Sequence, residues 1–175
     1  MPANFVVEDG SAVDGANSYC SVADADQINL DYENSVDWIA ATDAEKEMAL
    51  RQATRYLDLH YIWDGYKVYE DQVLMWPRYE MYDEDDNYLA EDEIPTKVIQ
   101  ACVYLAIKVI EGDTLLEDFQ NEGKVKKSKD VVGPLTEERE YVFGEYPDKT
   151  YQVADKLLAS LIIGKGWTST ELERG

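Results

Sequence analysis

A run of acidic side chains without a base raises the question of whether this chain binds calcium. Eight Asp and Glu residues fall within one short stretch, with no Lys or Arg among them. An EF-hand loop needs Asp at position 1, oxygen ligands at positions 3 and 5, Gly at 6 and a bidentate Glu at 12. Counted from Asp83, the residues Asp85 and Asn87 fit, but Tyr88 and Ile94 occupy positions 6 and 12. We therefore expect a solvated turn here and no metal site.

Catalysis would need a histidine, a thiolate or a pair of carboxylates in contrasting surroundings. His60 is the only histidine, and its helical spacing from Tyr56 and Leu57 predicts a packed or half-exposed helix residue. Neither Cys20 nor Cys102 has a His or Lys nearby in sequence that would favour a thiolate. With 37 acids in the chain, some carboxylate pair would look suggestive in any fold. We expect no catalytic residue and no enzyme.

The two cysteines also bear on cofactors and on the cellular compartment. They lie far apart in sequence, and reduced thiols in a cytoplasmic setting are expected, with a single disulfide as the alternative. Two Cys and one His do not favour a structural zinc site, and neither standard Gly-rich phosphate loop occurs. No cofactor is therefore expected.

The charge balance limits the kinds of partner that the chain can have. Sixteen Lys and Arg stand against 37 Asp and Glu, which gives a net charge of −21. Such a surface repels nucleic acid and anionic lipid at long range. It suits a partner with a basic face, or a wall along which DNA moves without sticking.

One segment departs from this acidic balance. Lys124, Lys126, Lys127 and Lys129 form the densest basic segment of the chain. Together with 13 Tyr and 4 Trp, these lysines could support base stacking and phosphate contacts to single-stranded DNA. Tyr and Trp are equally enriched at protein interfaces, and the lysines could instead meet an acidic face on a neighbouring copy. The charge balance favours the interface.

Length and hydropathy indicate one domain. A chain of 175 residues with 45% hydrophobic content fits a single globular domain over residues 1–175. The N-terminus lacks the basic and apolar regions of a signal peptide. No apolar run approaches the roughly 20 residues that span a bilayer. A soluble protein with no membrane partner is expected.

Capping residues predict where the first helices begin. Ser21 has an acid three residues later, the spacing of a capping box, and is expected to start a helix over about 21–32. Thr42 repeats the arrangement more clearly and starts a long helix over about 42–61.

Two further helices are predicted in the second half of the chain. Pro95 suits the first turn of the most apolar helix, which we expect to end at Gly112. The apolar stripe of that helix consists of Val98, Ala101, Cys102, Leu105, Ala106, Val109 and Ile110. A last helix is predicted over about 151–163. Its inward side chains are expected to be Val153, Leu157, Leu158, Leu161 and Ile162.

Strand-like residues around turn residues predict a β-hairpin over about 121–143. Gly133 and Pro134 lie inside it, and the proline restricts its position to an edge or a bulge. The expected fold is mainly α: a small bundle of about four helices, with an inserted β-hairpin or extended arm and extended termini. The helical core covers about 21–163, and residues 164–175 form a polar tail.

The order of several short motifs resembles a known family. In chain order they are VVEDG (6–10), ANSY (16–19), SVADA (21–25), ALRQATRYLD (49–58), QVLMWPR (72–78), IPTKVIQA (94–101), VK (125–126) and VGPL (132–135). This pattern resembles the tailed-phage and prophage family often labelled "DnaT-like single-stranded DNA-binding protein", whose members resemble head–tail adaptor proteins. The resemblance runs from about Val6 to Leu161, and the Trp-Pro-Arg and Val-Gly-Pro-Leu stretches are its most specific parts.

The resemblance implies a structural virion protein located in the neck and made in the host cytoplasm. Its subunits, commonly 12, would form a homo-oligomeric ring beneath the portal protein that extends the DNA channel and docks the next connector or tail component. Viral double-stranded DNA would pass through the lumen without tight binding. The family label implies the alternative, a DnaT-like single-stranded DNA-binding protein in replication. The family often has a Gly in the turn after Trp-Pro-Arg, whereas this chain has Asn87-Tyr88.

The Trp-Pro-Arg motif is expected to form a fixed structural corner. Trp76 would pack on the helices, Pro77 would hold an extended bend, and Arg78 would pair with an acid or a backbone carbonyl. The full set of structural or interface candidates is Trp76, Pro77, Arg78, Lys124, Lys126, Lys127, Lys129, Gly133, Pro134 and Trp167.

Overall fold

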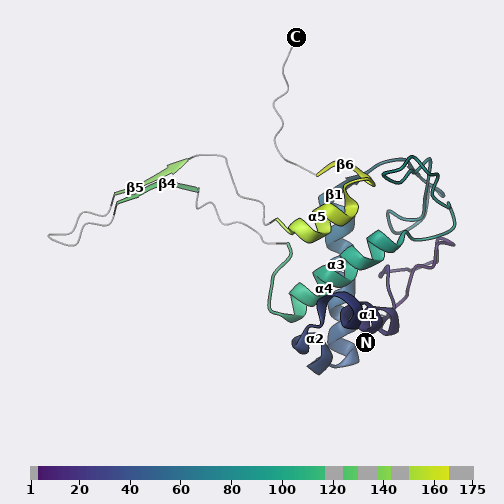
Figure 1. The fold of residues 1–175 in the computed structure, drawn as a ribbon, viewed down its shortest axis with the longest axis horizontal. Helices are drawn as coiled ribbons and strands as arrows, with labels where there is room; N and C mark the ends of the chain where they lie inside the picture. Colours follow the sequence, from purple (N-terminus) through teal and green to yellow (C-terminus); the bar gives the residue numbers. More distant parts are fainter. Residues whose placement is uncertain (1–3, 117–123, 130–137, 143–149, 166–175) are drawn as a thin grey trace, which may run out of the picture. The chain divides into compact units, whose positions relative to one another are not determined.

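The structure is a computed structural model of the chain, and it is mainly helical. The residues that it describes are 4–116, 124–129, 138–142 and 150–165. The chain divides into two compact units, one made of Met1–Leu115 with Tyr151–Gly175 and the other of Leu116–Thr150. The first unit contains the helices and the second contains a β-hairpin (Figure 1). The predicted fold class, mainly α with an inserted hairpin, is confirmed.

The first helix begins where its capping residue predicts. The chain starts with an extended arm, in which Val7 makes a single parallel bridge to Ser18. Helix α1 spans Val22–Ile28, and the Ser21 hydroxyl accepts a hydrogen bond from the Asp24 N–H at 3.1 Å. An N-terminal N–H that would otherwise lack a partner is thereby satisfied.

Beyond α1 the chain forms two short helical segments, one of which was not predicted. A π-helical segment, η1, continues over Asn29–Glu33 and ends at Asn34, which has a left-handed backbone with φ 49°. Ser35 then caps helix α2, which spans Val36–Ala40. Helix α2 is an addition to the four predicted helices, because five residues are too few to display a helical period.

The long central helices follow the sequence signals closely. Helix α3 spans Asp43–His60 and begins with a complete capping box between Thr42 and Glu45. Helix α4 spans Thr96–Ile110, so Pro95 is its N-cap rather than a residue of its first turn, a correction of one position. Gly112 has φ +98° just beyond the end of α4, as its predicted role requires.

The predicted last helix is too long. Helix α5 spans Gln152–Leu158, and Ile162–Lys165 forms strand β6 instead of the last helical turn. Strand β6 pairs antiparallel with β1 (Tyr61–Trp63), which directly follows α3. A distant strand therefore supplies the backbone hydrogen bonds of β6, and local periodicity cannot reveal such a partner. Of the predicted inward residues, Leu158 and Leu161 are buried and Leu157 and Ile162 pack against the core, whereas Val153 is exposed and Ala154 is buried in its place.

The remaining strands form two further pairs. β2 (Tyr66–Lys67) pairs antiparallel with β3 (Arg78–Tyr79). In the second unit, β4 (Lys124–Lys129) pairs antiparallel with β5 (Glu138–Val142), with a register shift in β4 typical of a bulge. The predicted hairpin is confirmed, while Gly133 and Pro134 lie outside the described residues.

Helix α4 is the centre of the helical unit, and it packs against both α3 and α5. Its buried side chains are Val98, Ala101, Cys102, Val103, Leu105, Ala106 and Ile107. They extend further around the helix than the predicted stripe, because neighbours cover more than one of its sides (Figure 1). Within the described ranges, none of the helices combines the length and the apolarity that crossing a membrane requires.

Candidate functional site

Arg78 lies at the centre of the Trp-Pro-Arg corner and is only 7% exposed. Its Nε donates a hydrogen bond to the Asp64 carbonyl at 2.6 Å, and its Nη2 donates to the Gly65 carbonyl at 2.7 Å. Its Nη1 donates to the Met75 carbonyl at 3.1 Å. The prediction that Arg78 pairs with an acid or a backbone carbonyl is confirmed. Because its donors are used inside the fold, this cation joins two loops rather than binding a ligand.

A buried tyrosine and an aspartate join the same corner to α3. The hydroxyl of Tyr19 donates to Asp58 Oδ1 and accepts the N–H groups of Met75 at 3.1 Å and Trp76 at 3.2 Å. The other carboxylate oxygen of Asp58 accepts the Met75 N–H at 3.2 Å. Burial raises the pKa of Asp58 to about 6, although the hydrogen bond from Tyr19 opposes this rise.

One buried amide holds the loop that leads into the corner. Gln72 Nε2 donates to the carbonyls of Leu74 at 2.9 Å and Pro77 at 3.0 Å. Its Oε1 accepts the Tyr69 N–H at 3.0 Å. Three backbone groups of one loop are thus satisfied by a single side chain, so this loop needs no regular secondary structure.

The aromatic part of the corner is fully buried. Trp76 belongs to the hydrophobic core, and its ring lies edge-on to that of Trp63 with 5.6 Å between centroids. The peptide bond between Trp76 and Pro77 is cis. Since Trp76 and Arg78 are both buried within one chain, they act as structural residues and not as an exposed interface. We refer to the set Tyr19, Asp58, Gln72, Trp76 and Arg78 as the corner cluster.

The corner cluster unites three of the motifs that gave the family resemblance. Tyr19 ends ANSY, Asp58 ends ALRQATRYLD, and Gln72, Trp76 and Arg78 belong to QVLMWPR. Tyr19 bonds Asp58 and the backbone of the QVLMWPR stretch, and Gln72 and Arg78 bond backbone groups of the same corner. In this chain these motifs therefore form a fold signature rather than a surface for DNA.

The acidic loop is held by hydrogen bonds to one of its own carboxylates, Asp83. Asp83 Oδ1 accepts the N–H groups of Asp85 at 2.9 Å and Asn87 at 2.8 Å, and the Asn87 amide donates to both Asp83 oxygens. These hydrogen bonds lower the pKa of Asp83. Glu84 pairs with Lys97 on α4 and accepts from Ser160 at 3.3 Å. Among the described residues, no group of three or more His, Cys, Asp or Glu side chains is placed to hold a metal ion. The arrangement is a self-capped surface turn.

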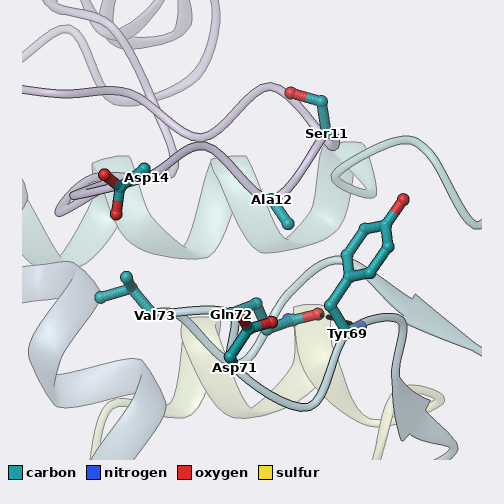
Figure 2. Close-up of a pocket in the computed structure, with 7 residues that line it drawn as sticks. All are labelled: Ser11, Ala12, Asp14, Tyr69, Asp71, Gln72 and Val73. Carbon is teal, nitrogen blue, oxygen red and sulfur yellow. Dashed lines mark hydrogen bonds between the residues drawn. The ribbon is translucent and has the colours of Figure 1, made fainter.

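A surface cleft of about 350 Å³ separates the N-terminal loop from the loop before the corner. Figure 2 shows Asp14 on one side of it, with Asp71, Gln72 and Tyr69 on the other. Two of the seven lining residues are acids and none is Lys or Arg. The amide of Gln72 is already hydrogen-bonded to backbone groups. The cleft therefore suits a cationic side chain better than a phosphate.

Exposed tyrosines lie close to the corner cluster in sequence. Tyr66, Tyr69, Tyr82 and Tyr88 are each about half exposed or more. Tyr82 and Tyr88 pack edge-on at 5.5 Å. Tyr69 and Tyr82 are each followed by an acid, whereas Tyr66 is followed by Lys67. Exposed tyrosines are typical of protein interfaces.

The lysine-rich segment lies on strand β4 of the hairpin unit. The register places Lys127 opposite Glu140 and Lys129 opposite Glu138. Strands β4 and β5 together contain five Lys or Arg and two Glu, so their net charge is 5 − 2 = +3. The two strands are thus basic in a strongly acidic chain, whereas the connection between them (130–137) adds two acids and no base. Trp167, like Gly133 and Pro134, lies outside the described residues.

The histidine and the cysteines have structural surroundings. His60 is half-buried and stacks on Tyr56 with 4.6 Å between ring centroids, as its helical spacing predicts. Cys20 and Cys102 are both free and buried. Burial raises the pKa of the Cys102 thiol to about 12, although a hydrogen bond from Thr54 opposes this. Both thiols are therefore protonated at neutral pH, since burial also raises the pKa of Cys20.

Sequence reasoning missed three members of the corner cluster. Tyr19, Asp58 and Gln72 have no hydrophobic period or motif chemistry that marks them as buried and paired. Their only signal was their place within the family-like motifs. A polar residue on a helix, such as Asp58, is normally expected to be solvated.

Comparison with known proteins gives one match. A family model described as "Putative DnaT-like ssDNA binding protein" matches residues 3–175, which is nearly the whole chain. No curated protein and no solved structure matches the chain.

Proposed function

The chain belongs to the DnaT-like ssDNA-binding protein family, and we propose that it is a structural virion subunit, a head–tail adaptor. Copies of it would form a ring beneath the portal protein, with 12 as the expected number. The ring would extend the DNA channel and dock the next connector or tail component. The protein would perform no chemical step in this role.

The observation that carries this proposal is the exposure of large apolar and aromatic side chains among acids. Fifteen of them are exposed on the described residues, several in one short stretch between α1 and α3. Exposed apolar side chains that cluster mark protein–protein contact surfaces. The acids between them repel phosphate, so these contacts suit proteins and not nucleic acid.

The net charge of −21 fits a wall around moving DNA. A surface that repels phosphates within about one Debye length would let viral DNA slide past without binding. The buried corner cluster supports a structural role as well, because the family-like motifs are used to fix loops. None of these features requires a cofactor.

The adaptor proposal is tested by assembly with the portal. Purified protein is mixed with purified portal in buffer of virion-like ionic strength, and complexes are weighed by native mass spectrometry. A ring bound to portal is expected, and mass spectrometry of purified virions should detect the protein. Protein that stays monomeric with portal, and is absent from virions, would exclude this function.

Single-stranded DNA binding in replication is the second candidate, and the family description speaks for it. The lysines of β4 are its only dense basic segment. A fluorescent oligonucleotide should then show an anisotropy change at low salt, where phosphate contacts are strongest. Replacing Lys124, Lys126, Lys127 and Lys129 by Glu should abolish the change, and replacing the α5 residue Lys156 should not. No change with the unaltered protein would exclude this candidate.

A further inference from the structure

Four large apolar side chains lie exposed within ten residues of one another. They belong to η1 and α2, and their exposed fractions lie between 55% and 74%. They are Leu30, Tyr32, Val36 and Ile39. We call this set the η1–α2 surface. Such a concentration of apolar area is unusual for a surface that contacts only water.

Buried polar contacts hold the η1–α2 surface in place. The side chain of Asn29 is fully buried and accepts the Ser35 N–H at 2.9 Å, which closes the turn between η1 and α2. Trp38 is fully buried, and its indole N–H donates to Asp26 at 2.8 Å. Lys46 pairs with the same carboxylate at 2.8 Å. The exposed apolar side chains therefore project from a fixed backbone, which lowers the entropy cost of docking.

The exposed charges on the η1–α2 surface itself are acidic, and the nearby cations Lys46 and Lys108 each pair with an acid. Asp31, Glu33 and Asp37 are exposed between the apolar side chains. Residues 1–45 contain ten Asp or Glu and no Lys or Arg. A nucleic acid or an anionic lipid is repelled by such a face, so its occupant must be basic as well as partly apolar.

The chain contains one segment with these properties. Strand β4 has four lysines, one valine and no acid. Within the described residues, β4 and β5 form a two-stranded sheet, and the edge of such a sheet can pair with another chain. Charge complementarity thus matches β4 to the η1–α2 surface.

We infer that the η1–α2 surface of one copy docks strand β4 of a second copy. This inference rests on the proposed function and names the contact that would build the ring. The two patches differ, so the contact is heterologous: each copy donates one β4 and receives another. Heterologous contacts close into rings when their rotation allows it.

Carbodiimide cross-linking tests the contact directly, because it joins a lysine amine to a carboxylate with no spacer. An equal mixture of unlabelled and ¹⁵N-labelled full-length protein is cross-linked and digested. Peptides with mixed labels should join Lys124–Lys129 to the stretch that contains Asp31, Glu33 and Asp37. Links confined to one label, or links from β4 to other acids only, would overturn the inference.

An exposed-residue variant tests the apolar part with little risk to folding. Ile39→Ser should weaken self-association by about tenfold or more, as expected of a central interface residue. Ile163→Ser is the matched control, since Ile163 is also exposed and lies on β6. Equal effects of the two substitutions, or none from Ile39→Ser, would overturn the inference.

A charge exchange tests the electrostatic part. One variant carries Glu at Lys124, Lys126, Lys127 and Lys129, and the other carries Lys at Asp31, Glu33 and Asp37. Each variant alone should fail to self-associate, and their equal mixture should form the contact again. A mixture that stays apart while each variant keeps its circular dichroism spectrum would overturn the inference.

The two proposals fail in different ways. If rings form on the portal while Ile39→Ser and the cross-links show no β4 contact, the inference fails and the adaptor function stands. If Ile39→Ser blocks portal binding but leaves self-association intact, the η1–α2 surface binds another protein and the inference fails. If the cross-links appear but virions lack the protein, the contact stands and the adaptor function fails.

Discussion

Two regions of this protein place carboxylates against backbone N–H groups under opposite conditions. In the corner cluster, the half-buried Asp58 accepts the Met75 N–H and the Tyr19 hydroxyl. In the acidic loop, Asp83 accepts the N–H groups of Asp85 and Asn87 at the surface. Burial raises the pKa of Asp58, whereas hydrogen bonds lower the pKa of Asp83.

The difference shows that access to water decides how much a polar cluster contributes to stability. A buried group that loses its partner cannot be compensated by solvent, so each bond of the corner cluster contributes to stability. Water replaces a lost bond in the exposed loop, and its acids are therefore replaceable. In sequence the acidic loop raised the question of a metal site. In the structure, the hydrogen bonds that stabilise the fold lie in the corner cluster.

Trp76→Ala should have the largest effect on the corner cluster. It empties a fully buried indole site, and the expected loss is about 3–5 kcal/mol in the free energy of unfolding. Urea unfolding followed by circular dichroism measures this loss. Tyr66→Ala, at an exposed aromatic, is the control and should shift the midpoint little. If the Trp76→Ala protein is as stable as the unaltered protein and still assembles, the corner cluster is no more important for stability than the acidic loop.

Arg78→Met should cost somewhat less, about 3 kcal/mol, because three backbone carbonyls lose their donor while the hydrophobic volume is largely kept. The same substitution at Arg55, which is exposed on α3, is the control. The urea midpoints of the two variants should differ clearly. Equal midpoints would mean that water reaches the carbonyls around Arg78.

Asp58 should give the protein an unusual pH dependence. Its pKa in the folded state, about 6, lies above the ordinary 3.8, so the fold disfavours the charged form. Stability from this residue should therefore increase by about 1 kcal/mol as the pH falls from 7 to 5. Urea unfolding at several pH values measures the slope.

Asp58→Asn provides the comparison for that slope. The variant keeps the overall acidic charge of the chain almost unchanged but has no titrating group at this position. The difference in the free energy of unfolding between the two proteins should be constant above pH 7 and change by about 1 kcal/mol between pH 7 and pH 5. Parallel pH profiles would show that Asp58 is solvated in the folded state.

Neutralising the acidic loop should have the smallest effect. The triple variant Asp83→Asn, Asp85→Asn, Asp86→Asn keeps oxygen acceptors, and Asn tolerates the left-handed backbone of Asp86, where φ is 60°. Its circular dichroism spectrum and urea midpoint should match those of the unaltered protein. Calcium should not raise the midpoint of either protein, because a ligand that binds the folded state stabilises it. A calcium-dependent increase would establish a metal site in this loop.

Local signals predicted most of the helical unit. Capping residues at Ser21 and Thr42 placed two helix starts, and the apolar residues of α4 predicted its central position. Elements with distant partners were predicted less well. Ile162 and Ile163 were predicted to be helical, whereas they belong to β6, whose hydrogen-bond partner β1 lies about a hundred residues earlier in the chain.

One part of the candidate site, the Trp-Pro-Arg motif, could be predicted from the sequence, and its partners could not. The Trp-Pro-Arg motif suggested a fixed corner with an acid or a backbone carbonyl as the partner of Arg78, and the structure shows three carbonyls. The partners Tyr19 and Asp58 could not be inferred, because their contact joins residues 39 positions apart and neither has a local pattern.

The sequence by itself determined the acidic charge, the starts of α1 and α3, the apolar centre at α4 and the basic segment at β4. These properties depend on composition or on neighbours within a few residues, where backbone geometry is nearly the same in any fold. Only the tertiary structure decided which polar groups are buried together and which apolar side chains remain exposed. Burial is a property of the whole packed chain, since a side chain is removed from water only by residues that may be far away in sequence.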